Sequence, residues 1–298
     1  RYTDDKKDFS LDVPQPESQY APIFAYGFTT DGPIQSSDSW QDTQMRLIGR
    51  WHFGDNSMVF ASYTEGFKSG GFGSFALVDG NGDLVPCCTT DVDQASGARS
   101  RGFEPETVDS YELGYKSTIL DGHADINLSG FMYNYEDLQI SFFDANTGAN
   151  TVENIGEVDG LGLEGSMTAQ FNDNWNLYLA LSYLDTEATG LQAVCDGDTE
   201  DSCEGSALFW APEWSGAAVL NANFPVGGGE ITGSLEAFYE GERGGGWGAY
   251  PETMIDPNTI MALRVGYASD NNWAITGYVE NLTDEFTYDG MNNNGGIL

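Results

Sequence analysis

Polar and apolar residues alternate along most of this sequence with a period of two, and this alternation constrains the fold more than any other feature. Between Trp175 and Tyr183 every odd position holds Trp, Leu or Tyr, whereas the even positions hold Asn, Tyr, Ala and Ser. Successive side chains of a β-strand point to opposite faces, so the pattern predicts a strand with one apolar face. Similar or more mixed alternation covers residues 44–51, 57–65, 109–116, 123–132, 162–169, 214–223, 231–239, 261–267 and 273–281. The sequence therefore predicts an all-β fold of about ten strands, with residues 1–11 as a candidate eleventh.

The length of these segments and the residues at their ends favour a transmembrane antiparallel β-barrel over a soluble sandwich, which would alternate too. A strand needs roughly 9–11 residues to cross a bilayer at a tilt, whereas soluble strands average about 5–6. Many of the apolar rows end in aromatic residues, as in the aromatic girdles at the two membrane interfaces. These residues are Trp51, Tyr63, Tyr115, Trp175, Tyr183, Tyr239, Tyr267 and Trp273.

Short and long connections alternate along the chain. The short ones are 54–56, 120–122, 172–174, 225–229 and 269–272, and the long ones are 67–107, 136–160, 186–213 and 241–258. Outer-membrane barrels have short periplasmic turns and long extracellular loops, so this rhythm predicts that location and orientation. Lipid offers no hydrogen bonds, so a spanning sheet must close. We expect residues 1–298 to be part of a larger barrel, because no closing strand follows residue 281.

The charge balance excludes two classes of partner. Lys and Arg number 11 against 47 Asp and Glu, for a net charge of −36. A nucleic acid or an anionic membrane surface requires a basic patch, so neither is expected as a binding partner. The sequence contains no run of about 18 apolar residues, so no membrane-spanning helix is predicted.

Catalytic chemistry is not expected. The only histidines, His52 and His123, each adjoin a short turn, where a solvated role is the simpler interpretation than membership of a hydrolytic triad. No glycine-rich phosphate loop leads into a helix. We therefore predict a non-enzymatic protein.

The cysteines and one acidic turn suggest local features of the loops. Cys195 and Cys203 flank a short polar segment, and we predict a disulfide between them, whereas the pairing of adjacent Cys87 and Cys88 stays open. Asp79, Asn81 and Asp83 resemble the start of a calcium loop, although Leu84 and Thr90 stand where an EF-hand has Gly and Glu. A plain Gly/Asp turn is the alternative to a Ca²⁺ site, and no other cofactor is expected.

Four segments, in this order, resemble the C-terminal half of TonB-dependent outer-membrane receptors. They read SYTEGFKSGGF (62–72), EPETVDSYELGYK (104–116), NIG with GLE (154–156 and 162–164) and VENLTD (279–284). The resemblance implies a barrel of about 22 strands around an N-terminal plug, of which this chain would supply 10–11 strands but neither the plug nor the last strand. It also implies energy-coupled uptake of a scarce nutrient (a siderophore, haem, vitamin, sugar or peptide), driven by the inner-membrane TonB complex. A passive pore or an adhesion barrel is the alternative.

Charged residues on the polar faces of the strands are expected to point into the barrel lumen. Glu112, Glu164 and Glu280 would bond there to the plug or to nearby cations, or else line the path of the substrate. The cations expected on the same face are Arg46, Arg50, Lys116 and Arg264.

The long loops supply the predicted ligand contacts. Phe142, Phe143, Trp247 and Tyr250 offer aromatic area, whereas Trp210 and Trp214 precede a strand and suit an interface belt instead. Arg243 is one of few loop cations and would meet an anionic group. The loops are otherwise acidic, which disfavours a strongly anionic ferric siderophore unless a local cationic pocket forms. Lipid and lipopolysaccharide are the expected surroundings of the barrel.

Overall fold

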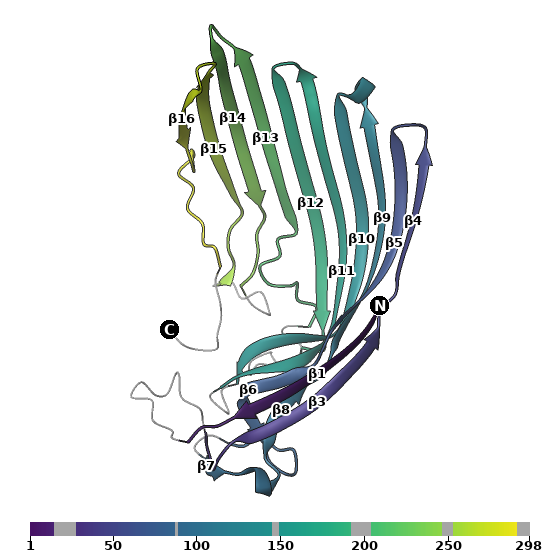
Figure 1. Cartoon of the computed structure of the whole chain (residues 1–298), viewed down its shortest axis with the longest axis vertical. Helices are drawn as coiled ribbons and strands as arrows, with labels where there is room; N and C mark the ends of the chain where they lie inside the picture. Colours follow the sequence, from purple (N-terminus) through teal and green to yellow (C-terminus); the bar gives the residue numbers. More distant parts are fainter. Residues whose placement is uncertain (15–27, 87–88, 145–148, 192–203, 246–252, 291–298) are drawn as a thin grey trace.

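The chain folds almost wholly into β-strands (Figure 1). The computed structural model describes residues 1–14, 28–86, 89–144, 149–191, 204–245 and 253–290. Two single-turn 3₁₀ helices, η1 (Gln94–Ser96) and η2 (Leu120–Gly122), are the helical elements in these ranges. No helix in the described ranges is long and apolar enough to cross a membrane. The predicted all-β class is confirmed.

Ten strands form one antiparallel sheet in the order β16-β15-β14-β13-β12-β11-β10-β9-β5-β4. Each of the ten segments predicted from alternation overlaps one of these strands, with differences of one or two residues at some ends. Their bounds are β4 (Arg46–Phe53), β5 (Ser57–Lys68), β9 (Glu106–Ile119), β10 (Ala124–Asp144), β11 (Ala149–Asn172), β12 (Trp175–Thr189), β13 (Trp214–Pro225), β14 (Gly229–Glu240), β15 (Asn258–Ser269) and β16 (Trp273–Val279). Within the described residues the sheet stays open, with β4 and β16 at its edges, so a total of 22 strands stays a prediction.

The short connections lie together at one end of the sheet and the long ones at the other, which we call the turn end and the loop end (Figure 1). Between β9 and β10 the turn requires positive φ at Leu120, Asp121 and Gly122. Asp and Gly tolerate this left-handed region better than other residues, which is why such turns recur at strand junctions. The in-phase rhythm of short and long connections therefore matches the sequence prediction.

The two faces of the sheet differ in polarity. On the outer face Leu113 is 65 % exposed, Leu163 60 % and Ile275 69 %. A soluble domain would bury such side chains, because each stabilises the fold by about 1.5–3 kcal/mol when removed from water. An apolar face that remains uncovered over many strands is the surface that a barrel presents to lipid.

Aromatic rings border this apolar band on the outer face. Near the turn end the ring of Phe53 lies 6.1 Å from that of Tyr115. Two further pairs there are Trp175–Phe224 at 5.7 Å and Tyr267–Trp273 at 5.4 Å. Near the loop end the pairs are Tyr63–Tyr111 at 4.9 Å and Tyr183–Trp214 at 4.8 Å. These two rows have the arrangement expected of girdles at the two membrane interfaces.

A folded layer of loops, which we call the loop layer, covers part of the loop end. Its two-stranded sheets are β1 (Tyr2–Leu11) with β3 (Ile34–Thr43), β6 (Gly71–Val78) with β8 (Arg99–Phe103), and the parallel pair β2 (Phe28–Thr30) with β7 (Thr89–Val92). These elements share a small buried core. Its members are Leu11, Val13, Phe28, Ile34, Leu77, Val85, Val92 and Ala98.

The candidate eleventh strand of the main sheet was wrong in its placement. Residues 2–11 form β1, but β1 pairs with β3 and lies outside the ten-stranded sheet. The reason is that Leu11 is buried in the loop-layer core and Phe9 packs against it, so the apolar residues of β1 meet protein rather than lipid. Strand β3 in turn leads into β4 with only Gln44 and Met45 between them.

The predicted loop 136–160 was also wrong, because most of it is strand. β10 continues to Asp144 and β11 begins at Ala149, so the hairpin extends far beyond the length needed to cross a bilayer. A second small core supports the extension. It joins buried Val158, Ala188 and Leu191 with the partly buried residues Tyr133, Tyr135, Leu138, Ile140 and Leu208.

Candidate functional site

The inner face of the sheet holds a wide, open hollow that both polar and apolar residues line. Register places Glu112, Lys116 and Glu164 on one face, opposite the outer-face leucines. The hollow has a volume of about 670 Å³ and spans strands β5 to β14. Besides those three residues its lining includes Asn127, Ser129, Ser166, Ser182, Ser215 and Glu240. Such a surface suits water, a polar solute or another protein segment rather than lipid.

The other residues predicted to face the lumen lie on the same face. On the neighbouring strand β5, Arg46 is opposite Thr64 and Arg50 is opposite Phe60. Phe60 is in turn opposite Gly114 on β9, which lies midway between Glu112 and Lys116. The Lys116 ammonium lies 5.7 Å from the centre of the Phe60 ring. Their contact with a plug or a substrate stays a prediction.

Arg264 forms the strongest charge cluster on this face. Its Nη1 pairs with Oε1 of Glu236, and its Nη2 lies 3.7 Å from Oε1 of Glu280. The Ser234 hydroxyl also donates to Glu236 at 3.1 Å. Sequence reasoning named Arg264 and Glu280 but did not select Glu236, although strand alternation already placed Glu236 on the polar face.

Four cations of the loop end are paired with acids. Lys68 lies 3.4 Å from Glu106, and Arg101 pairs with Glu153. Two further pairs, Lys6–Asp8 and Lys7–Asp5, each span 3.6 Å. Pairing leaves the loop layer without a strong positive field, which agrees with the acidic balance of the sequence.

Arg243 departs from that pattern, because one of its donors is free. Its side chain is 6 % exposed, and its Nη2 lies 3.1 Å from Glu240 and donates to the Tyr288 carbonyl at 3.2 Å. Its Nη1 is buried without a hydrogen-bond partner. A buried donor without an acceptor costs about 1–3 kcal/mol, so Nη1 is suited to an incoming oxygen.

Trp210 lies beside Gly244, the residue after Arg243, and its place in an interface belt stays a prediction. Its backbone N–H donates to the Gly244 carbonyl at 2.7 Å, and its side chain is 47 % exposed. Trp214, by contrast, stacks near Tyr183 on the outer face, as expected. The local sequence does not distinguish Trp210 from Trp214, because the contact between Trp210 and Gly244 joins two loops that are distant in the sequence.

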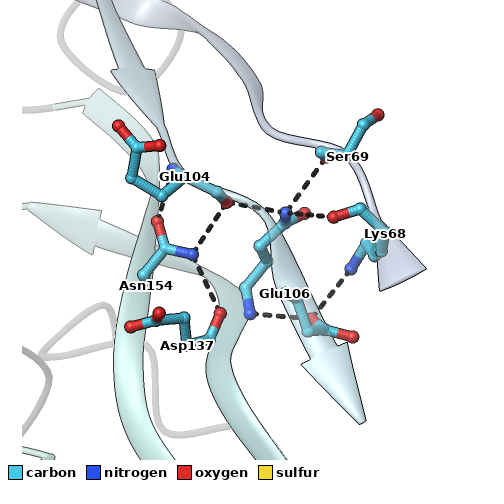
Figure 2. Close-up of polar contacts among 7 residues, drawn as sticks. Lys68, Ser69, Glu104, Glu106, Asp137 and Asn154 are labelled. Atoms are coloured by element: carbon cyan, nitrogen blue, oxygen red, sulfur yellow. Dashed lines mark hydrogen bonds and ion pairs between the residues drawn. The ribbon is translucent and has the colours of Figure 1, made fainter. Parts of the chain in front are cut away.

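A second polar group ties the long hairpin to the loop layer (Figure 2). The side-chain amide of Gln139 donates to the carbonyls of Lys68, Ser69 and Glu104 at 3.4, 3.1 and 2.9 Å. The amide of Asn154 donates to the carbonyls of Glu104 and Asp137, both at 2.8 Å. Asn154 was read only as part of a family motif, and Gln139 carried no signal in the sequence.

The predicted calcium residues form a tight turn. Asp79 Oδ1 accepts the backbone N–H groups of Asn81 at 2.8 Å and Asp83 at 3.0 Å. These bonds hold the pKa of the Asp79 carboxyl below its usual range. Within the described residues no group of three or more His, Cys, Asp and Glu side chains is arranged to hold a metal ion. The Ca²⁺ site stays a prediction.

Several predicted residues lie outside the part of the chain that the structure describes. They are Trp247, Tyr250, Cys87, Cys88, Cys195 and Cys203. Phe142 and Phe143 belong to β10, where their backbones pair with Thr151 and Asn150, but their side chains are outside the description. The proposed disulfide and these aromatic contacts stay predictions.

Solved structures share this fold. The ferric yersiniabactin uptake receptor FyuA from Yersinia pestis matches 88 % of this chain and 36 % of its own length, with a TM-score of 0.67 and 18 % identity. The ferric-catecholate import receptor Fiu from E. coli K12, in its closed form, matches 97 % of this chain and 38 % of its own length, with a TM-score of 0.62 and 15 % identity.

Sequence comparison gives the family. A probable TonB-dependent siderophore receptor of Acinetobacter baumannii, PiuA, is 32 % identical over 101 residues, which is 33 % of this chain and 13 % of that protein. The chain thus spans a small part of this relative. The family described as "TonB dependent receptor-like, beta-barrel" matches residues 1–282. Its members are outer-membrane receptors rather than enzymes, and this chain belongs to the TonB-dependent receptor family as part of the β-barrel.

Proposed function

We propose that the protein containing this chain takes up a ferric siderophore across the outer membrane, with energy from the TonB complex. The observation that carries the proposal is a barrel wall whose inner face bears charged and polar residues around an open hollow of about 670 Å³ and whose loop end bears a folded layer. Membership of the receptor family and the likeness to siderophore receptors support this choice among nutrients. The outer face would lie against lipid and lipopolysaccharide.

The charges of the loop end narrow the siderophore class. The chain carries a net charge of −36, and acids pair with Lys6, Lys7, Lys68 and Arg101. A ferric chelate of low net charge avoids the repulsion that a highly anionic chelate would meet. The free Nη1 of Arg243 would donate a hydrogen bond to one anionic or carbonyl oxygen of that chelate. Phe142, Phe143, Trp247 and Tyr250 remain proposed contacts around it.

Uptake of nutrients that each carry a radioactive label tests the function. The complete receptor is expressed in cells that lack their own siderophores and siderophore receptors, and ferric hydroxamate, ferric catecholate, haem, cobalamin, sugar and peptide are offered in turn. We expect uptake of a ferric siderophore, and none in an otherwise identical strain without TonB. Uptake that persists without TonB would indicate a passive pore. Uptake of another nutrient alone would contradict the proposal that the substrate is a ferric siderophore.

Replacement of Arg243 tests the proposed contact. Arg243→Lys keeps a positive charge but removes Nη1, so the Kd for the ferric siderophore should rise by about ten-fold, the equivalent of one charge-assisted hydrogen bond. Arg264→Lys, on the inner face of β15, is the matched control for barrel assembly. An unchanged Kd in a folded Arg243→Lys receptor would exclude Arg243 from the site.

A further inference from the structure

The long hairpin loses its neighbour at a defined point. Glu136 is the last residue of β10 that pairs with β9, where its partner is Thr107. Asp137, which follows, has a positive φ of 54° and is missing from the ladder between β10 and β11. The residues beyond it, 138–144 and 149–155, form an outer half of the hairpin that β9 does not support.

The backbone opposite this point has almost no free space. Gly156 on β11 lies against the backbone of Thr189 and Gly190, and a side chain there would collide with the Thr189 carbonyl. The Gly156 N–H donates to the Gly190 carbonyl at 3.4 Å. The crossing of β11 over the end of β12 is therefore close, and the outer half starts from a constrained position.

Strand β5 ends and strand β9 begins at this level, so the carbonyls at these two strand ends lie at or beyond the edge of their ladder. β5 ends at Lys68 and β9 begins at Glu106, so Lys68, Ser69 and Glu104 lie at or beyond the ladder. Residue 105 is proline, which has no N–H to offer. A carbonyl left unbonded costs free energy, so side-chain donors are needed.

The amides of Gln139 and Asn154 are those donors. Gln139 reaches the carbonyls of Lys68, Ser69 and Glu104, and Asn154 reaches those of Glu104 and Asp137 (Figure 2). Asn154 also accepts the Glu104 N–H through its Oδ1 at 2.7 Å. Both residues belong to the outer half, whereas Lys68, Ser69 and Glu104 belong to the junctions that lead into β6 and out of β8. We call this set of bonds the amide clamp.

Two charged contacts reinforce the amide clamp. The carboxylate of Glu106 is 11 % exposed, and it accepts the Gln139 N–H at 2.8 Å while lying 3.4 Å from the Lys68 ammonium. Further out, Glu153 on β11 pairs with Arg101 on β8. The outer half is thus joined to the loop layer through backbone, amide and ion-pair contacts.

We propose that Gln139 and Asn154 are positioning residues, which hold the outer half of the β10–β11 hairpin rigidly against the loop layer so that ligand meets a preorganised surface. Neither side chain needs to touch the ligand. Preorganisation raises affinity because the ordering entropy is lost during folding rather than during binding. The ligand part of this inference rests on the proposed siderophore uptake, whereas the rigidity part does not.

Single replacements in the complete receptor test the amide clamp. Gln139→Ala and Asn154→Ala remove the donors, and Asn154→Asp removes the donors at nearly constant volume. Asn134→Ala is the matched control, because its amide lies on the same strand and donates at 2.9 Å to Asp159, away from the junctions. Heat-modifiable mobility on gels confirms that each barrel has assembled.

Hydrogen exchange and ligand binding are the two readouts. We expect exchange of residues 138–144 and 149–155 to rise by about ten-fold in the three clamp variants, with β13 and β14 unchanged. The Kd for the ferric siderophore should rise by about ten-fold while the uptake rate at saturating ligand stays the same. Exchange equal to that of Asn134→Ala would overturn the amide clamp. If the unmodified receptor binds no ferric siderophore, the proposed function fails, and exchange still decides on the amide clamp.

Discussion

At the scale of single residues, glycines on the inner face make room for aromatic rings on the neighbouring strand. Phe60 covers Gly114, and Phe131 covers Gly162 directly across the ladder. A ring over a cross-strand glycine restores the packing that glycine lacks and helps to set the register. These glycines therefore have a steric role that the alternation of polarity does not reveal.

Gly162→Ala should destabilise the barrel. A Cβ at this position collides with the Phe131 ring, and overpacking costs about 1–3 kcal/mol. The free energy of unfolding, measured by urea titration of the refolded receptor in lipid vesicles, should fall by that amount. Gly49→Ala, where nothing lies within 4 Å of the added atom, should change it little. Equal effects of the two changes would contradict the steric role.

The turn at Asp79 should open in acid. The pKa of its carboxyl is lowered in the folded state by the N–H groups of Asn81 and Asp83, so the turn is stabilised above the unfolded pKa of about 3.9. That stabilisation is lost as pH falls through the lower folded pKa. Limited digestion of the receptor by pepsin, compared across that range, should show cleavage near the turn only at the acid end. Asp79→Ala, which lacks the acceptor, should be cleaved at every pH in that range, whereas Asp83→Asn should behave as the unmodified protein does.

At the scale of elements, the same two strands serve in two surroundings. The first part of the β10–β11 hairpin carries apolar residues toward lipid, and the extended part rests on the small core around Val158, Ala188 and Leu191. Val158 and its cross-strand partner Tyr135 lie on the same face as Glu164, so the small core packs against the inner face of the hairpin and not against the outer face that carries Leu163.

Leu191→Ala should loosen the extended hairpin without affecting the transmembrane sheet. Leu191 is fully buried, and removal of such a side chain costs about 2–5 kcal/mol through lost burial and a cavity. Hydrogen exchange should accelerate in residues 138–144 and 149–158 but not in β13 or β14. Leu120→Ala, at a position that is 68 % exposed, should leave exchange unchanged. A uniform increase along the barrel would show that the small core is not a local unit.

At the scale of the whole molecule, hydrophobic burial and charge are separated in space. The buried apolar clusters among the described residues lie at the loop end, whereas the large exposed apolar residues line the outer face of the sheet. Acids exceed cations by 36 over the chain. A surface with this charge balance disfavours the approach of anionic solutes through long-range repulsion.

Ionic strength should reveal that repulsion. The Debye length shortens from about 30 Å at 0.01 M salt to about 8 Å at 0.15 M, so the repulsion of an anionic ligand weakens. The association rate of a strongly anionic ferric chelate should rise several-fold over this range, whereas that of a neutral ferric hydroxamate should stay constant. Stopped-flow fluorescence of the complete receptor measures both rates. A fall in the association rate of the anionic chelate with rising salt would indicate a local cationic path.

Part of the candidate site was predictable from sequence. The inner-face positions of Glu112, Glu164 and Arg264 follow from alternation alone, because neighbouring residues of a strand point to opposite faces. Arg243 was singled out as a scarce loop cation, but its free Nη1 was not predictable, because burial depends on segments that meet from separate loops. Gln139 gave no signal for the same reason, since its three acceptors lie about 35 to 70 residues away in the chain.

The sequence by itself determined that this chain is a membrane-facing antiparallel sheet with short turns at one end and long connections at the other. Polarity at every second residue and turn-forming residues at the junctions are local properties, so they can be read along the chain. Only the tertiary structure decided that β1 joins the loop layer, that residues 136–160 continue as a hairpin and that two amides clamp it. Those outcomes depend on contacts between segments that are distant in the sequence, such as the contact of Leu11 with the core that contains Val92. A local sequence pattern does not contain the free energy of such contacts.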